Sequence, residues 1–165
     1  MGKLKVELVP KTCFYSNVRT LLPKKYWDQL RKESYEKANH KCEICGDTGK
    51  KQGYRHNVEC HEIWEYDDVF KVQILNGLIS LCPKCHQVKH FGRTSAIGKQ
   101  PEAFKHLEKV NNWNHRDCVN HLKETMAQWL DRSKYKWHID LSLLNEKYKI
   151  PKKLITEAQK KRKKS

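Results

Sequence analysis

Long apolar runs are absent from this sequence of 165 residues. No stretch approaches the roughly 20 consecutive apolar residues that a membrane-spanning helix needs, so we expect no membrane association. The start, MGKLKVELVPK, has no apolar segment of the kind found in secretory signals, and Val6 stands where a myristoylation signal carries Ser or Thr. We therefore expect an intracellular protein, cytoplasmic or, if the host cell has a nucleus, nuclear.

Proline and glycine are scarce, at five and seven residues. Low-complexity and collagen-like chains are rich in both, so neither class applies. Apolar residues make up 38% and charged residues 32% of the chain, which is typical of an ordered protein with a modest core. The length suits one domain, and we expect it to span residues 1–150.

Acidic residues are also few: 19 Asp and Glu face 34 Lys and Arg, for a net charge of +15. Such an excess attracts polyanions, and nucleic acid is the commonest polyanion in cells; a merely solvated surface is the alternative. Residues 150–165 hold seven Lys or Arg and one Glu. We expect residues 151–165 to form a basic tail, either a flexible phosphate-contacting arm or a disordered terminus.

Periodicity and turn residues predict a mixed α+β arrangement. Strands are expected at 4–9, 58–64 and 69–81, helices at 23–39, 83–90, 102–110 and 117–130, and loops at 46–57 and around Gly92 and Gly98.

Two Cys-x-x-Cys pairs stand out among the seven cysteines. Cys42 and Cys45 form the first pair, Cys82 and Cys85 the second. In an intracellular protein such pairs indicate metal ligands, and two of them complete a tetrahedral shell around Zn²⁺ with no position left for water. The sequence thus predicts a structural zinc site; a redox dithiol is the alternative.

The second pair runs directly into two histidines, His86 and His90. Histidines at i and i+4 lie on one face of a helix, where both can ligate one ion. His61, in the preceding predicted strand, could approach the same place from the other side. We therefore expect a second divalent ion, Mg²⁺, Mn²⁺ or Zn²⁺, at the junction.

These elements resemble the HNH, or ββα-metal, endonuclease family. The specific part of the resemblance is CEIC at 42–45, ECHEIW at 59–64 and LCPKCHQVKH at 81–90, and the flanking segments 19–46 and 128–144 resemble small stand-alone HNH proteins. The resemblance implies a zinc-stapled ββα-metal core at 42–92, wrapped by N-terminal and C-terminal helices.

The resemblance also implies roles for single residues. His61 would be the general base, while His86 and His90 would hold the catalytic ion. In the family an Asp or His precedes the base, whereas this chain has Cys60, which either selects a softer ion, stays unliganded or leaves Glu62, Asp67 or Asp68 to complete the site. Glu62 is expected either to orient an imidazole or to carry a surface charge. The family's middle asparagine falls at Gly77, one position after Asn76.

The activity implied is hydrolysis of phosphodiester bonds in DNA, with a duplex as the expected substrate. Two alternatives stay open at this point. One is a non-catalytic zinc module that binds nucleic acid, and the other is an HNH subunit that acts only inside a larger nucleoprotein assembly.

Overall fold

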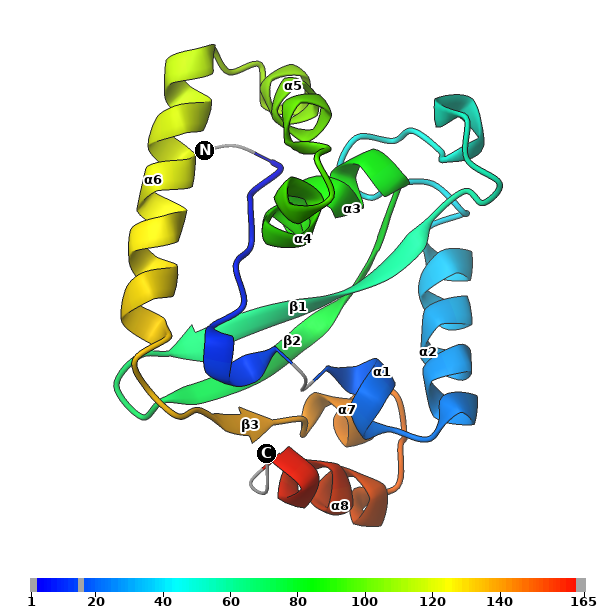
Figure 1. Cartoon of the computed structure of the whole chain (residues 1–165). Coiled ribbons are helices and arrows are strands. Elements are labelled where there is room, and N and C mark those ends of the chain that lie inside the picture. The colour runs from blue at the N-terminus through cyan, green and yellow to red at the C-terminus, as the bar shows by residue number, and fades with distance from the viewer. Residues whose placement is uncertain (1–2, 15–16, 163–165) are drawn as a thin grey trace.

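A long β-hairpin crosses the middle of the molecule, and helices surround it (Figure 1). The computed structural model of the chain describes residues 3–14 and 17–162 and shows a mixed α+β fold. In chain order the elements are η1 (Lys11–Cys13), α1 (Val18–Leu21), α2 (Lys24–Lys37), η2 (Lys50–Gln52), β1 (Glu59–Asp67), β2 (Val72–Leu81), α3 (Pro83–Lys89), α4 (Phe91–Ala96), α5 (Gln100–Asn111), α6 (His115–Arg132), β3 (His138–Asp140), α7 (Leu143–Glu146) and α8 (Lys152–Arg162).

The turn of the hairpin lies further along the chain than the sequence predicts. β1 and β2 pair antiparallel from Glu59↔Leu81 to Asp67↔Val72, so β1 ends three residues after the expected strand at 58–64, and β2 begins three residues after the start of the expected strand at 69–81. Asp67 Oδ1 accepts hydrogen bonds from the backbone nitrogens of Val69 and Phe70, both at 2.9 Å, and thereby makes the turn. A short third strand that the sequence did not predict, β3, pairs parallel with β2.

A register shift in the hairpin decides which side chains share a face. Ile63 pairs with Gly77 and Trp64 with Leu75, so Asn76 is an extra residue in β2. Because strand residues alternate between faces, such a bulge exchanges the faces of the residues beyond it. As a result, Leu75 joins a different hydrophobic cluster from Leu81.

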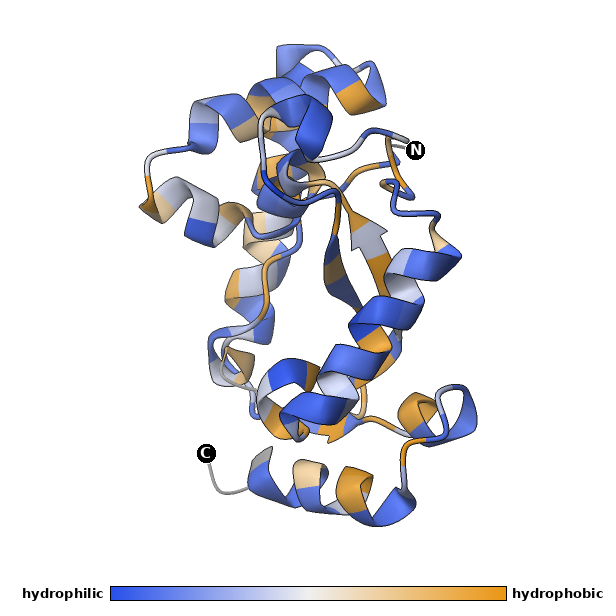
Figure 2. Cartoon of the chain, turned by 90° about the vertical axis from the view of Figure 1, so that its right-hand side faces the viewer, coloured by the Kyte–Doolittle hydropathy of each residue, from blue (hydrophilic) through white to orange (hydrophobic). Residues whose placement is uncertain are grey.

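Two hydrophobic clusters pack against the hairpin. The first contains the cysteine pairs together with residues of α3, α5 and the N-terminal segment, such as Leu107 and Leu4. The second is built from α1, α2, α7, α8 and β3 and includes Leu30, Leu144 and Ile155. In Figure 2 hydrophobic and hydrophilic residues are mixed along the helices, the pattern of helices that pack one face against a core. Truncation of a fully buried leucine in either cluster to alanine would lower the free energy of unfolding by several kcal/mol.

The N-terminal segment is not the predicted strand at 4–9. It runs extended between α6 and the hairpin without joining the sheet (Figure 1). Its backbone hydrogen bonds go to helices instead: Asn111 pairs with the nitrogen and oxygen of Leu4 at 2.9 and 2.7 Å, the His121 ring accepts the Val6 N–H at 3.0 Å, and the Lys89 carbonyl accepts the Glu7 N–H at 3.1 Å. Helices flank the segment, so it meets no strand edge with which to form a ladder.

Helix α2 begins and ends close to the predicted positions. Pro23 is its N-cap rather than its first residue, and α2 ends at Lys37. Asn39 and His40 follow with φ of 50° and 54°, a left-handed conformation that stops a helix. Helices α5 and α6 also match the predicted helices at 102–110 and 117–130, with slightly wider bounds.

Two predictions in the second half of the chain are wrong. The expected loop around Gly92 contains α4, which buried Phe91 anchors and which the Thr94 hydroxyl ties to the Gln87 carbonyl at 2.7 Å. The expected basic tail forms α8 over residues 152–162, and its Ile155 is buried in the second cluster. Residues 163–165 of that tail lie outside the described part of the chain. Tertiary packing overrides the low helix propensity of glycine in the first case and the charge run in the second.

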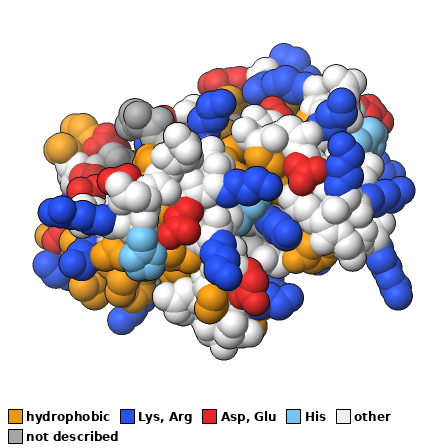
Figure 3. All heavy atoms as spheres, turned by 90° about the horizontal axis from the view of Figure 1, so that it is seen from above, with side chains coloured by type: hydrophobic (Ala, Val, Ile, Leu, Met, Phe, Trp, Pro, Cys, Tyr) orange, Lys and Arg blue, Asp and Glu red, His pale blue; other side chains and the backbone are white. Residues whose placement is uncertain are grey.

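Within residues 3–14 and 17–162, no helix combines the length and the apolar character that crossing a bilayer would require. Figure 3 shows Lys and Arg side chains spread over the face seen from above, around exposed histidine.

Candidate metal centres

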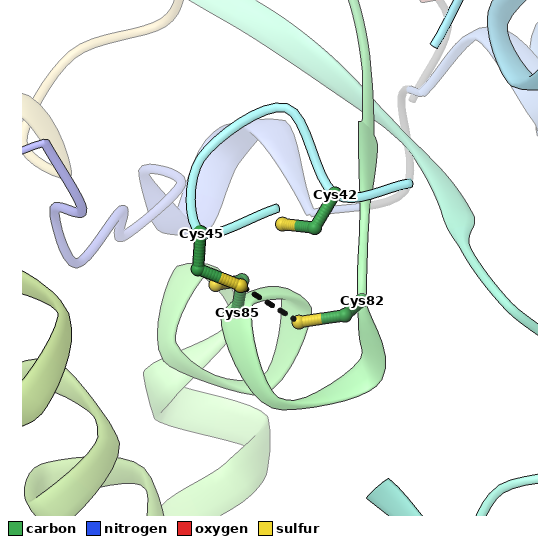
Figure 4. Close-up of side chains that lie close together, drawn as sticks. All are labelled: Cys42, Cys45, Cys82 and Cys85. Atoms are coloured by element: carbon green, nitrogen blue, oxygen red, sulfur yellow. Dashed lines mark hydrogen bonds between the residues drawn. The ribbon is translucent and has the colours of Figure 1, made fainter. Parts of the chain in front are cut away.

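The four paired cysteines converge at the start of α3. Cys42 and Cys45 lie on the turn after α2, and Cys82 and Cys85 lie on the first turn of α3, with all four sulfur atoms within 4.8 Å of one another. Figure 4 shows the four side chains pointing toward a common centre, with 3.6 Å between the sulfurs of Cys45 and Cys82. The predicted four-cysteine arrangement is therefore present, and its all-sulfur donor set fits a tetrahedral Zn²⁺.

The turns that present the thiols follow from local backbone chemistry. Gly46 has φ of 75° and donates to the Cys42 carbonyl at 2.9 Å, which closes the first knuckle. Pro83 opens α3 directly after Cys82, where its missing N–H costs no hydrogen bond. Hydrogen bonding with Cys45 lowers the pKa of Cys42, which favours the thiolate form that a metal needs.

Two further side chains touch the sulfur atoms. Gln52 Nε2 donates to Cys82 Sγ at 3.2 Å, and His106 Nε2 lies 3.2 Å from Cys85 Sγ. Donors to coordinating thiolates disperse their negative charge and orient them. Neither residue carries a spacing signal in the sequence, because Gln52 comes from the loop and His106 from α5.

A second cluster contains the three predicted histidines. His61 on β1, His86 on α3 and His90 at the end of α3 each offer a ring nitrogen, and these nitrogens lie within 4.8 Å of one another. His61 Nδ1 is 3.2 Å from His90 Nε2, and the His86 and His90 rings are 4.5 Å apart between centroids. The structure thus brings together the strand histidine and both helix histidines.

Carboxylates fix two of these imidazoles from behind. Glu7 Oε2 is 2.8 Å from His61 Nε2, and Glu59 Oε2 is hydrogen-bonded to His86 Nδ1. Each carboxylate accepts an N–H, which leaves His61 Nδ1 and His86 Nε2 with lone pairs that face the cluster. Glu7 also pairs with Lys89.

The pKa values agree with this protonation pattern. Burial raises the pKa of Glu7, but the hydrogen bond to His61 and the charge of Lys89 outweigh burial, and the net shift is downward. The hydrogen bond to His86 lowers the pKa of Glu59. Burial, together with His86 and His61, lowers the pKa of His90 to about 3, so its ring is neutral at neutral pH. Neutral imidazoles and ionised carboxylates are the forms that metal binding requires.

Cys60 does not join the histidines, contrary to one of the sequence-based alternatives. Successive residues of β1 point to opposite faces, so Cys60 lies toward Ser34 on α2 while His61 lies toward α3. Burial raises the pKa of the Cys60 thiol to about 12, which keeps it protonated. Among the three alternatives given for Cys60, a thiol that binds no metal matches this placement.

Glu62 does not hydrogen-bond an imidazole either. Its Oε1 accepts the backbone N–H of Val18 at 2.9 Å, and burial raises its pKa. The Glu62 side chain is half-buried and lies near His61 and His86, and it lines the same cavity as His61. Glu7 and Glu59 make the hydrogen bonds to imidazoles that were considered for Glu62. Glu59 lies two residues before His61 on the same strand, so strand alternation could have placed both side chains on one face. Glu7 is 54 residues from His61, and no sequence pattern connects the two.

The remaining acidic and amide candidates lie away from the cluster. Asp67 makes the hairpin turn, Asp68 pairs with Arg132, and Asn76 donates to Glu65 Oε1 at 2.7 Å on the exposed bulge. Gly77 faces Ile63 across the hairpin. None of these side chains completes a metal site with the three histidines.

The donor set of the histidine cluster is three imidazoles without a ligating carboxylate. Such a set fits Zn²⁺ and other nitrogen-preferring divalent ions, whereas Mg²⁺ prefers oxygen ligands. Three imidazole ligands, or two if His61 acts as a base, leave one or more positions for water or substrate, in contrast to the four-cysteine cluster. His61 and His90 also line a cavity of about 780 Å³, so a ligand can reach them.

No family model, curated protein or solved structure matches the chain. The geometry of the two clusters therefore carries the functional argument.

Proposed function

We propose that this protein is a metal-dependent endonuclease of the HNH type, which hydrolyses phosphodiester bonds in DNA. The observation that carries the proposal is the convergence of His61, His86 and His90 from a β-hairpin and the helix that follows it, with ring nitrogens within 4.8 Å. A bound divalent ion would polarise the scissile phosphate and stabilise the leaving oxygen.

His61 has the features of a general base. It is buried, at 5% exposure, and its Nε2–H is oriented by Glu7, so that the Nδ1 lone pair is the atom able to take a proton from water. His86 and His90 stand one helical turn apart and suit the ligand role, with Glu59 orienting the His86 ring. The four-cysteine cluster does no chemistry in this scheme and fixes the start of α3.

The charge of the chain supports a nucleic-acid substrate. The net charge of +15 and the spread of Lys and Arg over the face in Figure 3 favour contact with phosphates. Such contacts add affinity without sequence specificity.

The direct test is cleavage of plasmid DNA by the purified protein in Mn²⁺, Ni²⁺, Zn²⁺ or Mg²⁺. His61→Ala should lower the rate by at least about 100-fold, the usual contribution of a general base. His115→Ala is the matched control, since His115 is 78% exposed and lies outside the cluster. Unchanged cleavage by His61→Ala would contradict the assigned base.

Measuring the metal content distinguishes a general base from a metal ligand at His61. It also distinguishes the nuclease from a non-catalytic zinc module. If His61→Ala loses cleavage but keeps an exchangeable ion, His61 is the base; if it loses both, His61 is a third ligand. A wild-type chain that holds a single tightly bound zinc and cuts no DNA would favour a non-catalytic zinc module.

A further inference from the structure

A cavity adjoins the histidine cluster, and the proposed function does not yet use it. It has a volume of about 780 Å³, within the range of roughly 300–1,000 Å³ of small-molecule sites. Residues of the N-terminal segment, β1, β2 and helices α3 to α6 line it. His61 and His90 are among them, so an occupant of the cavity would adjoin the candidate metal centre.

The wall on the α6 side is apolar. Leu8, Leu122, Met126 and Trp129 line it, and Met126 is 46% exposed. Phe14, which is 53% exposed, lines the same cavity. Large apolar side chains that stay exposed around one concave surface indicate a binding site for an apolar or aromatic group.

Charged side chains of both signs line the cavity near the histidines. Lys89 is paired there with Glu7, and the Glu62 carboxylate and the exposed Arg93 on α4 line the same cavity. The proposed metal centre, rather than the lining, would therefore hold a negative group. A phosphate bound there would lie beside the histidines, and the apolar wall would hold a flat apolar group of the same ligand, which describes a nucleotide.

We propose that this cavity binds the unpaired nucleobase next to the scissile phosphate. The inference rests on the proposed nuclease function and adds the kind of substrate: DNA with an unstacked nucleotide at the cleavage point, such as a bulge or mismatch, rather than a continuous duplex. Both faces of a paired base are covered by its neighbours in the stack, so a base can contact the cavity wall only after it has left the helix.

The energetics favour an unpaired substrate over a perfect duplex. Extruding a base costs a few kcal/mol from a paired helix and least from a mismatch or bulge. Contact with apolar and aromatic side chains then contributes to affinity without base identity. The cavity accordingly selects for local structure in DNA and not for sequence.

The His86→Ala variant allows binding to be measured without cleavage, because it lacks a proposed metal ligand. His86 does not line the cavity, so the substitution leaves the cavity wall unchanged. Two oligonucleotide duplexes of the same sequence are compared, one fully paired and one with a single-nucleotide bulge of 2-aminopurine. We expect roughly 10-fold tighter binding of the bulged duplex, the size of one base-stacking contact, and a change of 2-aminopurine fluorescence on binding.

A matched pair of variants then locates the contact. Met126→Glu and Leu130→Glu make the same charge change one turn apart on α6, and Leu130, at 54% exposure, does not line the cavity. Met126→Glu should abolish the preference for the bulge, whereas Leu130→Glu should weaken binding of both duplexes equally and keep their ratio.

Each outcome separates the cavity from the nuclease. Equal affinity for both duplexes, or an equal response of the ratio to both variants, overturns the nucleobase site, while wild-type cleavage of plasmid DNA would leave the nuclease standing. A preference for the bulge that Met126→Glu removes supports the site even if the wild-type chain cuts nothing, in which case the proposed nuclease function alone fails. Failure of the His86→Ala variant to bind either duplex overturns the nucleobase site, and cleavage of plasmid DNA by the wild-type chain then decides the nuclease function alone.

Discussion

The four-cysteine and three-histidine clusters share helix α3 but differ in how they are built. The cysteines come from two tight turns, three of the four are buried, and four sulfur donors close the shell. The histidines come from a strand and a helix, their rings depend on Glu7 and Glu59, and a cavity reaches them. A shell with every position filled can only stabilise, whereas one with open positions can also react. Because Cys85 and His86 are adjacent on this helix, the first cluster can fix the geometry of the second.

The largest effect is expected from a substitution in the four-cysteine cluster. Cys85→Ser should abolish the zinc binding expected of the four cysteines and destabilise the fold by several kcal/mol, because structural zinc in small peptides contributes roughly 10–16 kcal/mol. Zinc content and urea unfolding followed by circular dichroism measure this.

The control for that change is Cys118→Ala. Cys118 is buried in the same hydrophobic cluster but stands apart from the four-cysteine group. We expect it to cost about 1 kcal/mol with full zinc content. Equal losses from both substitutions would show that the four-cysteine cluster has no special role.

A smaller effect is expected from a substitution beside the three-histidine cluster. Glu7→Gln removes the carboxylate behind His61 and should lower kcat by roughly 10- to 100-fold, the usual cost of losing such a partner, with KM for DNA unchanged. Steady-state cleavage kinetics measure both constants.

Glu102→Gln is the matched control, since Glu102 is exposed in the first turn of α5. It should leave kcat unaltered. If Glu7→Gln lowers the melting temperature but not kcat, the carboxylate serves the fold alone.

The smallest effect is a dependence of stability on pH in the metal-free protein. The unfolded chain protonates His90 near its ordinary pKa of 6.5, while the folded chain does so only near 3. Acid therefore favours unfolding in this window, and the free energy of unfolding should fall by about 1 kcal/mol from pH 7.5 to 5.5. Urea unfolding at the two pH values measures it.

His90→Gln should flatten this dependence, because the substituted side chain does not titrate. Adding Zn²⁺ to the wild-type chain should also oppose the loss, since the bound ion competes with the proton. An identical slope in wild type and variant would assign the pH dependence to other groups.

Much of the fold around the clusters follows from local sequence signals. Both Cys-x-x-Cys turns, the hairpin and the helix opened by Pro83 were predictable, since each depends on residues close together in the chain. The i, i+4 spacing of His86 and His90 placed them on one face for the same reason. The errors fall where distant packing decides: α4, whose Phe91 is buried against other elements, and α8, whose Ile155 covers β3 and its neighbours.

The sequence by itself determined the donors: which thiols and imidazoles are available, and at what spacing. Only the tertiary structure decided what surrounds them. Strand alternation turned Cys60 away from His61, the bulge at Asn76 set the faces of the hairpin, and the N-terminal segment brought Glu7 to a histidine 54 residues away. Ligand spacing is a local property of the backbone, whereas a carboxylate partner is fixed by the packing of segments that no local pattern connects.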